Sequence, residues 1–136
     1  MKALVEWKGG MVLEGKNAEG MSTFFDSHHS AQEYATPMEI MLQAMASCSI
    51  MDVVSILEKK RKTIIALNVE VDSDRAENHP KVFTAVRLKY SLISPDAELK
   101  DLERSVELSQ HSYCSASAMF QKAGCEVSWI CEVSQS

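Results

Sequence analysis

The chain has 136 residues, of which 46% are hydrophobic and 24% are charged, and it contains only 5 Gly and 3 Pro. This length and composition fit one globular domain and exclude the disordered, collagen-like and disulfide-scaffold classes. The formal net charge of -5 gives no general electrostatic reason for the chain to bind nucleic acid or an anionic membrane.

The start of the chain and its apolar runs bear on where the protein works. Lys2 and Glu6 place charges where a signal peptide would carry an apolar segment, so we expect no secretion. The longest uncharged apolar stretch, residues 40–51, is shorter than the roughly 18 to 20 residues of a membrane-spanning helix. We therefore expect a cytoplasmic protein without a membrane segment, in which the cysteines are reduced thiols.

The N-terminal part of the chain predicts β structure followed by a loop. Gly9 and Gly10 separate two short segments, residues 3–8 and 11–16, and predict a hairpin with a two-residue turn. We expect a third strand over residues 21–26 and then a polar loop.

A long helix is predicted next. Thr36 has the side chain of an N-cap, Pro37 is favoured at the first helical position, and Glu39 completes a capping box. The helix should run to about Glu58, because no Gly or further Pro interrupts it and a basic run follows. Its apolar side chains point in nearly every direction around the axis, which is typical of a helix buried on several sides. One small sheet cannot cover them all, so we expect a homodimer in which the helix of a second copy covers the remaining face.

Two further strands are predicted by alternating apolar residues. The alternation indicates an antiparallel sheet that is covered on one side. The apolar positions are Ile65, Leu67, Val69 and Val71 in the first strand, and Val82, Thr84, Val86, Leu88, Tyr90 and Leu92 in the second.

The last part of the chain predicts two helices and a strand. Apolar residues at helical spacing indicate a helix that ends near Ser109, and a break over residues 110–113 follows. We expect a short helix over residues 115–122, ended by Gly124. The last strand places four side chains on its inward face, namely Cys125, Val127, Trp129 and Cys131.

The cysteines differ in their predicted surroundings. Cys125 and Cys131 lie about 20 Å apart on one strand and cannot bond to each other, so we interpret them as core residues. Cys48 lies about 16 Å into the long helix, too far from its N-terminus for the helix dipole to lower its pKa much. Cys114 directly precedes the last short helix, where unpaired N–H groups favour a thiolate, and the alternative is an ordinary half-buried turn cysteine.

Metal and cofactor sites are not predicted. His28, His29 and His111 could join cysteines in a metal site, but the chain has no Cys-x-x-Cys pair, and adjacent histidines in a polar loop are mostly solvated. The sequence also lacks the glycine-rich nucleotide loops and the Gly-x-Ser-x-Gly motif of serine hydrolases. We expect neither a metal nor another cofactor.

Two motifs, in this order, resemble those of the OsmC/Ohr family. The first runs from Thr36-Pro37-Met38-Glu39 through Ala44-Met45-Ala46-Ser47-Cys48 to Asp52-Val53-Val54, and the second from Leu108 to Tyr113-Cys114-Ser115-Ala116-Ser117-Ala118. The order of the predicted elements agrees along almost the whole chain. The resemblance implies a single OsmC-like domain over residues 1–136, with an α+β fold, an antiparallel sheet, a long central helix, and an intertwined homodimer whose active sites lie between the two copies.

The resemblance also implies a chemistry. Family members of the characterised type reduce organic hydroperoxides and hydrogen peroxide with two cysteines, and the matching positions are Cys48 and Cys114. Cys48 would attack the peroxide O–O bond, release an alcohol and become a sulfenic acid. Cys114 would condense with it to a disulfide, which a dithiol reductant would reduce. The implied function is an antioxidant, thiol-dependent peroxidase that acts under oxidative stress.

Two positions depart from the peroxidase pattern. The arginine that stabilises the thiolate from the N-terminal strands has no counterpart, since the first arginine is Arg61. The position after the helix-starting proline holds Met38, and Glu39 is displaced by one residue, which turns its carboxylate by about 100°. We keep Glu39 as a third candidate site residue beside its role as a helix cap, and Lys8 and Lys16 as substitute cations.

These departures leave a second interpretation open, a dimeric OsmC-like protein that binds an apolar ligand or senses redox state without catalysis. Asp52, one turn after Cys48, would raise the pKa of that thiol if it lay close and unpaired. Methionine-rich surfaces adapt to varied apolar ligands, and this chain has such residues near both motifs. They are Met38, Met41, Met45, Met51 and Met119.

Overall fold

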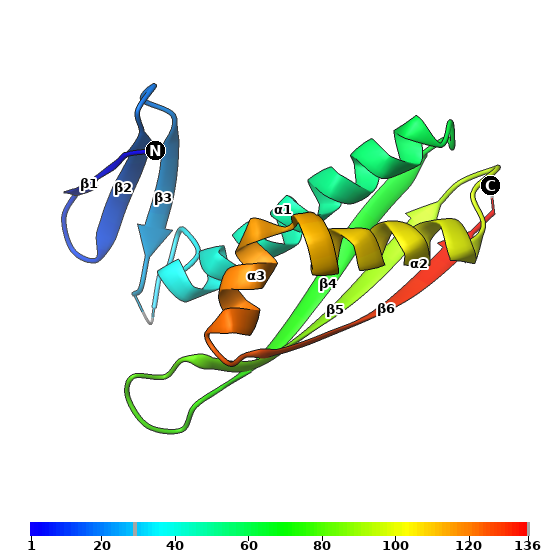
Figure 1. Cartoon of the computed structure of the whole chain (residues 1–136). Coiled ribbons are helices and arrows are strands. Elements are labelled where there is room, and N and C mark those ends of the chain that lie inside the picture. The colour runs from blue at the N-terminus through cyan, green and yellow to red at the C-terminus, as the bar shows by residue number, and fades with distance from the viewer. Residues whose placement is uncertain (29, 136) are drawn as a thin grey trace. The chain divides into compact units, whose positions relative to one another are not determined.

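The computed structural model describes residues 1–28 and 30–135 and divides the chain into two compact units, Met1–Leu42 and Gln43–Ser136 (Figure 1). Each unit contains one three-stranded sheet. The mixture of helices and strands confirms the predicted α+β class.

The N-terminal unit is an antiparallel meander of β1 (Ala3–Trp7), β2 (Val12–Asn17) and β3 (Ser22–Asp26), as predicted. The expected two-residue turn between β1 and β2 is wrong. The N–H of Lys8 donates to the carbonyl of Val12 at 2.9 Å, so three residues, 9–11, form the turn. Gly9 and Gly10 have φ angles of 108° and 56°, in the left-handed region that glycine tolerates. The indole N–H of Trp7 donates to the carbonyl of Gly10 at 2.8 Å and stabilises the longer turn.

Helix α1 (Pro37–Lys59) begins and ends close to the predicted residues. The N–H of Thr36 donates to Glu39 Oε1 at 2.9 Å, and the N–H of Glu39 donates to Thr36 Oγ1 at 3.2 Å. These two bonds are the predicted capping box, and they satisfy N–H groups that have no partner within the helix.

A single chain covers only one side of α1, which agrees with the expectation that one small sheet cannot cover all of its apolar side chains. The buried positions recur every three or four residues, which is the spacing of one helical face. They are Met45, Ala46, Ser49, Val53 and Leu57. On another side, Met51 keeps 71% of its surface exposed.

One helix bears on the expectation that the chain has no membrane segment. Among the described residues, α1 is the one helix long and apolar enough to do so by length and composition alone, because such a count tolerates its few charged residues. In the C-terminal unit α1 is the core helix, with Met45, Val53 and Leu57 fully buried, and core helices have the same composition.

The C-terminal unit contains a sheet with the order β4-β5-β6, formed by β4 (Ala66–Arg75), β5 (Phe83–Ile93) and β6 (Glu126–Ser134). Strands β4 and β5 pair antiparallel, as predicted. Strand β6 pairs parallel to β5, so the prediction of an antiparallel sheet is wrong for this pair. The chain crosses the sheet through α2 (Leu99–Leu108), a π-helical turn η1 (Ser109–Tyr113) and α3 (Ser115–Lys122), and a crossover of this kind returns it to a parallel strand.

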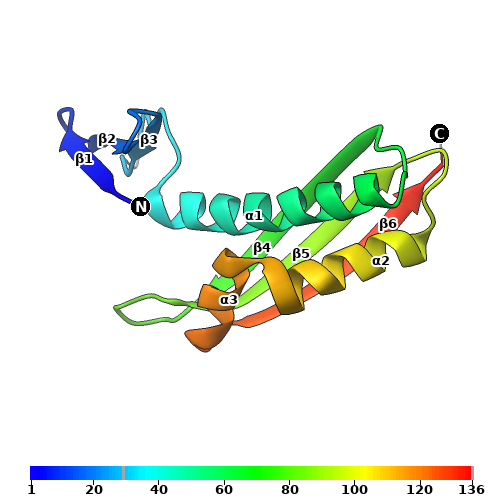
Figure 2. The same cartoon turned by 45° about the horizontal axis from the view of Figure 1, so that its top comes forward.

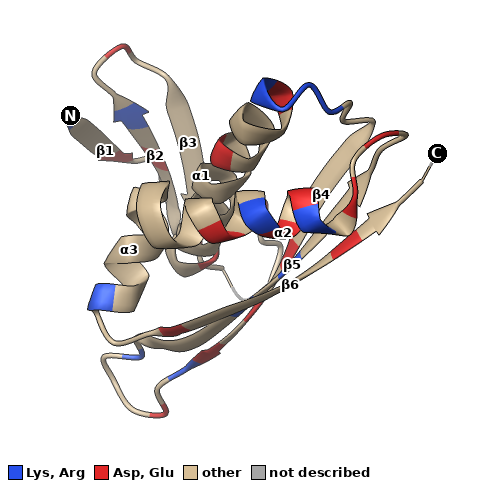
Figure 3. Cartoon of the chain, turned by 45° about the vertical axis from the view of Figure 1, so that its right-hand side comes forward, with Lys and Arg blue, Asp and Glu red and all other residues tan. Residues whose placement is uncertain are grey.

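The helices of this unit lie on one face of the sheet (Figure 2). Charged residues of both signs occur along α2 and the strands, whereas α3 carries one basic residue, Lys122, in its last turn (Figure 3). The core between the helices and the sheet is largely apolar but also contains buried polar side chains, among them Ser49, Ser109, Gln110 and Ser117. Its largest fully buried side chains include Met45, Val53, Leu57, Val86, Tyr90, Leu102 and Val106.

The start of β5 differs from the predicted alternation. The pairing of β4 with β5 shifts between Asp74 and Arg75. Such an irregularity changes which side chains face inward. Phe83 is therefore buried and stacks on Phe120, with ring centroids 5.5 Å apart, whereas Val82 and Thr84 are exposed.

Candidate functional site

The C-terminal unit brings Cys48 and Cys114 together, although 65 residues separate them in the sequence. Cys48 lies on α1 and is half-buried, and Cys114 lies between η1 and α3 and is 3% exposed. Their side chains are close enough for Cys48 to act on the pKa of Cys114. All 4 cysteines are free thiols.

Cys114 is the N-cap of α3, and its thiol has two polar neighbours. The Sγ atom accepts the N–H of Ser117 at 3.3 Å and points its own S–H toward the carbonyl of Met45 at 3.9 Å. Burial is the main cause that raises the pKa of the Cys114 thiol to about 11; the Ser117 N–H acts against it, and Cys48 and Asp52 make smaller raising contributions. The helix start therefore favours the thiolate locally, as the sequence suggests, but burial outweighs it.

The π-helical turn η1 sets the position of Cys114. The N–H of Cys114 donates to the carbonyl of Ser109 at 2.7 Å, five residues back, which is the bond that defines a π turn. The sequence predicts only a break here. The wider turn directs Ser109 and Gln110 into the interior, where they are 0% and 4% exposed.

A chain of buried hydrogen bonds runs beside the two thiols and joins α1, β5, η1 and α3. Gln110 Nε2 donates to the Tyr90 hydroxyl at 2.9 Å, and Tyr90 Oη lies 2.6 Å from Ser49 Oγ. Ser49 Oγ lies 2.9 Å from Ser109 Oγ, which donates to Asp52 Oδ2 at 2.9 Å.

The other end of this chain of hydrogen bonds reaches α3, the helix that Cys114 caps. The Ser117 hydroxyl donates to Gln110 Oε1, and Gln121 Nε2 donates to Ser117 Oγ at 3.0 Å. Every buried side-chain nitrogen and oxygen in the described residues has a partner. The polar chain is therefore fully satisfied, which is the condition under which such a network orders a core.

A cavity opens beside Asp52, where the polar chain ends. It has a volume of about 580 Å³ and combines an apolar wall with two lysines. The lining residues are Asp52, Ser55, Ile56, Lys59, Lys60, Leu108 and Tyr113. A cavity with a few polar groups beside apolar walls is typical of a small-molecule site.

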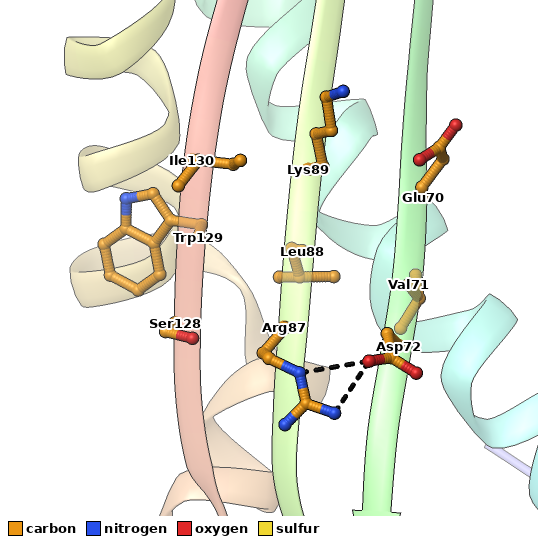
Figure 4. Close-up of a pocket in the computed structure, with 9 residues that line it drawn as sticks. All are labelled: Glu70, Val71, Asp72, Arg87, Leu88, Lys89, Ser128, Trp129 and Ile130. Atoms are coloured by element: carbon orange, nitrogen blue, oxygen red, sulfur yellow. Dashed lines mark hydrogen bonds and ion pairs between the residues drawn. The ribbon is translucent and has the colours of Figure 1, made fainter.

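A second cavity, of about 450 Å³, lies on the sheet face away from the helices (Figure 4). Arg87 reaches from β5 to β4, where its Nη2 atom donates to Asp72 Oδ2 at 2.7 Å, and its guanidinium also contacts Asp74. Arg87 faces away from the neighbouring inward residue Leu88, as successive side chains on a strand must. The two aspartates thus form ion pairs with this guanidinium, on the sheet face opposite to Tyr90 and its hydrogen-bond partners.

The third candidate residue, Glu39, has its capping role in the N-terminal unit. The backbone N–H of Thr36 is the main cause that holds the pKa of Glu39 below its ordinary value, followed by the Thr36 side chain. The two substitute cations are also paired there, since Lys8 lies 3.4 Å from Glu14 and Lys16 lies 3.3 Å from Glu6.

The remaining thiols and histidines have ordinary packing partners. Burial raises the pKa of Cys125, and burial together with Glu103 and Glu107 raises that of Cys131 to about 11. His28 bonds to Asp26 at 2.6 Å, and His111 packs edge-on against Trp129. His29 lies outside the described residues. In the two ranges that the structure describes, no three His, Cys, Asp or Glu side chains gather in a way that could hold a metal ion.

The sequence does not predict the polar chain. One signal was available, because Tyr90 belongs to the inward set of its strand and a buried tyrosine hydroxyl needs a partner. Gln110 and Ser109 carry no such signal, since their burial follows from the π turn.

Comparison with known proteins identifies the family. The model of the OsmC-like protein family matches residues 29–130. Protein YhfA of Escherichia coli K12 is 36% identical over 123 residues, which cover 90% of this chain and 91% of that protein. The chain therefore belongs to the OsmC-like family.

Solved structures agree on the fold. A hypothetical protein from Aquifex aeolicus VF5 is 28% identical, with a TM-score of 0.83 over 98% of this chain and 96% of its own. The organic hydroperoxide resistance protein OhrB of Bacillus subtilis is 14% identical, with a TM-score of 0.65 over 97% of this chain and 98% of its own. The likeness to OhrB is one of fold.

Proposed function

We propose that the protein is a two-cysteine peroxidase that reduces organic hydroperoxides, and hydrogen peroxide as well, in the cytoplasm. The observation that carries this proposal is the proximity of Cys48 and Cys114 in a partly buried place, in a chain of the OsmC-like family. The fold shared with a hydroperoxide resistance protein agrees with it.

Exposure assigns the two thiols to different steps. Cys48 is half-buried and can meet a peroxide, whereas Cys114 is almost fully buried and its pKa of about 11 keeps it protonated at neutral pH. Because the thiolate is the attacking species, Cys48 is the first nucleophile and Cys114 the resolving thiol. Glu39 is the third site residue that the sequence suggests, and its capping bonds to Thr36 support a structural role for it.

The proposed peroxidase cycle has three steps. The Cys48 thiolate attacks one peroxide oxygen, the O–O bond breaks, and the other oxygen leaves as an alcohol after taking a proton. Cys114 then gives up its proton as its sulfur attacks the sulfenic sulfur, the S–O bond breaks, and the disulfide forms with release of water. A dithiol reductant reduces the disulfide by exchange and restores both thiols.

We propose that the working form is a homodimer. A single chain leaves Met41 and Met51 of α1 exposed by 47% and 71%. Exposed apolar side chains on a helix of this composition favour association with a second copy. Replacing Met51 with Glu should shift the mass measured by light scattering to that of one chain, and an unchanged mass would contradict the proposal.

A second candidate function is a binder of amphipathic ligands or a redox sensor. The cavity beside Asp52, with an apolar wall and two lysines, favours it. So does the pairing of Lys8 and Lys16 with glutamates, because paired lysines are less available to stabilise a thiolate.

Thiol titration separates the peroxidase from the ligand binder. Free thiols are counted before and after one equivalent of cumene hydroperoxide, in the wild type and in Cys48→Ser, Cys114→Ser and Cys125→Ser. A peroxidase loses two thiols per chain in the wild type and in the matched control Cys125→Ser, and it accumulates a sulfenic acid at Cys48 in Cys114→Ser. Unchanged thiol counts under excess peroxide would remove the peroxidase and leave the binder.

A further inference from the structure

The directions of the buried hydrogen bonds can be assigned from one end of the polar chain to the other. A carboxylate only accepts, so Ser109 donates to Asp52, and the single hydroxyl proton of Ser49 then goes to Ser109. Because that proton is used, Tyr90 donates to Ser49, and the Tyr90 oxygen accepts from Gln110. The hydroxyl protons of Ser109, Ser49 and Tyr90 thus have assigned acceptors, and Gln110 Nε2 also lies 3.3 Å from Ser49 Oγ.

The chain of hydrogen bonds reaches both α1, which carries Cys48, and α3, which Cys114 caps. Ser49 follows Cys48 directly on α1. At the other end, Ser117 uses its backbone N–H for Cys114 Sγ at 3.3 Å and its hydroxyl for Gln110 Oε1. Tyr90 and Gln110 lie between these two serines and connect them.

We propose that Tyr90 and Gln110 are positioning residues that hold the Cys114 sulfur against Cys48 for disulfide formation. The inference rests on the proposed peroxidase function and concerns only its second step. In that step, sulfur attacks sulfur and water leaves, so the reaction needs both sulfurs in line at contact distance. The first step needs only an accessible Cys48 and a peroxide.

The packing around the chain explains why a hydrogen bond, and not apolar contact alone, has this role. Cys114 follows a π turn, whose backbone bond runs five residues back instead of the four of an α-helix. Ser109 and Gln110 within this turn are buried, and each bonds to Ser49 of α1. Removing these bonds releases the turn that carries Cys114 and leaves Cys48 on an intact helix.

The test measures the two steps separately in Tyr90→Phe and Gln110→Met, each of which keeps the side-chain size and removes the hydrogen bonds. The first step is the rate of dimedone trapping of the sulfenic acid, measured in the Cys114→Ser background. The second step is the rate of disulfide formation after one equivalent of cumene hydroperoxide, followed by acid quenching, alkylation and mass spectrometry. Tyr34→Phe, which loses the same hydroxyl from the N-terminal unit, is the matched control.

We expect the second step to slow about tenfold in Tyr90→Phe and more in Gln110→Met, while the first step and the control stay at wild-type rates. A second step at the wild-type rate in Tyr90→Phe would overturn the inference and leave the peroxidase proposal standing. Equal slowing of both steps would also overturn it, because that result is loss of structure. If the wild type loses no thiols, the proposed function itself fails, and this outcome is visible before any variant is compared.

Discussion

The sulfur of Cys114 accepts the backbone N–H of Ser117 at 3.3 Å, so the thiol caps the helix that follows it. An N-cap contact of this kind stabilises a negative charge on the acceptor. In this protein the contact works against almost complete burial, and the thiol stays protonated at neutral pH.

The titration of Cys114 should therefore destabilise the fold at high pH. Burial raises the pKa of this thiol from the ordinary 9.0 to about 11 in the folded chain, so the unfolded chain loses the proton first. The stabilising contribution is complete below pH 9 and is lost as the pH rises through 11. Between those values we expect the free energy of unfolding to fall by on the order of 2 kcal/mol. Urea unfolding at several pH values checks this, and Cys114→Ala should flatten the decline.

Loss of the Ser49 hydroxyl should cost stability whether or not the protein is an enzyme. Ser49 is fully buried and lies within hydrogen-bond distance of Tyr90 and Ser109. We expect Ser49→Ala to lower the free energy of unfolding by about 1 to 3 kcal/mol, because it leaves buried partners unsatisfied. Ser47→Ala, at an exposed position two residues earlier, is the control and should change it by less than about 0.5 kcal/mol. Equal effects in the two variants would contradict the role of the polar chain.

The capping box at the start of α1 gives a prediction about Glu39. Thr36→Ala should lower the free energy of unfolding by about 1 kcal/mol, because the N–H of Glu39 loses its acceptor. Glu39→Gln should keep most of the stability, since an amide oxygen can accept the N–H of Thr36 as the carboxylate does. If Glu39→Gln also keeps the wild-type rate of thiol loss with cumene hydroperoxide, the residue is a cap. A large loss of rate at unchanged stability would return it to the active site.

Acid should loosen the loop after β3. The backbone N–H groups of Glu33 and then His28 hold the pKa of Asp26 below its ordinary value. This contribution is present above the ordinary pKa of 3.8 and is lost as the pH falls through the lower folded value. Hydrogen exchange at the Glu33 amide should therefore show reduced protection at low pH. Asp26→Asn should show the reduced protection already at neutral pH, and full protection in that variant would refute the role of the carboxylate.

The sequence predicts the elements of this fold better than their arrangement. The start of α1 follows from local signals at Thr36 and Pro37, because capping and proline geometry act within one turn. The parallel pairing of β6 does not follow from its alternation, since Val127 and Trp129 alternate in the same way in either orientation. The π turn needs one residue more than an α turn, and no residue type marks that difference.

In the candidate site, too, the sequence predicts the parts better than their arrangement. The two cysteines are identified from motifs, and their proximity depends on tertiary contacts. Ser49 and Gln110 look like ordinary polar residues in the sequence, and only the packing of α1 against η1 makes them interior groups. Among the described residues, the two ionisable groups that act on the pKa of Cys114 are Cys48 and Asp52, and both raise it.

Parallel pairing of β6 with β5 delays completion of the sheet while the chain is being synthesised. The hairpin of β4 and β5 can form early, but the opposite edge of β5 stays open until α2, η1 and α3 have been translated and β6 can dock. Cys114 belongs to that connecting segment, so it reaches Cys48 late. Until then the thiols of the nascent chain are unsheltered, and an oxidant that arrives during translation can reach Cys114 and Cys125, which the folded chain buries.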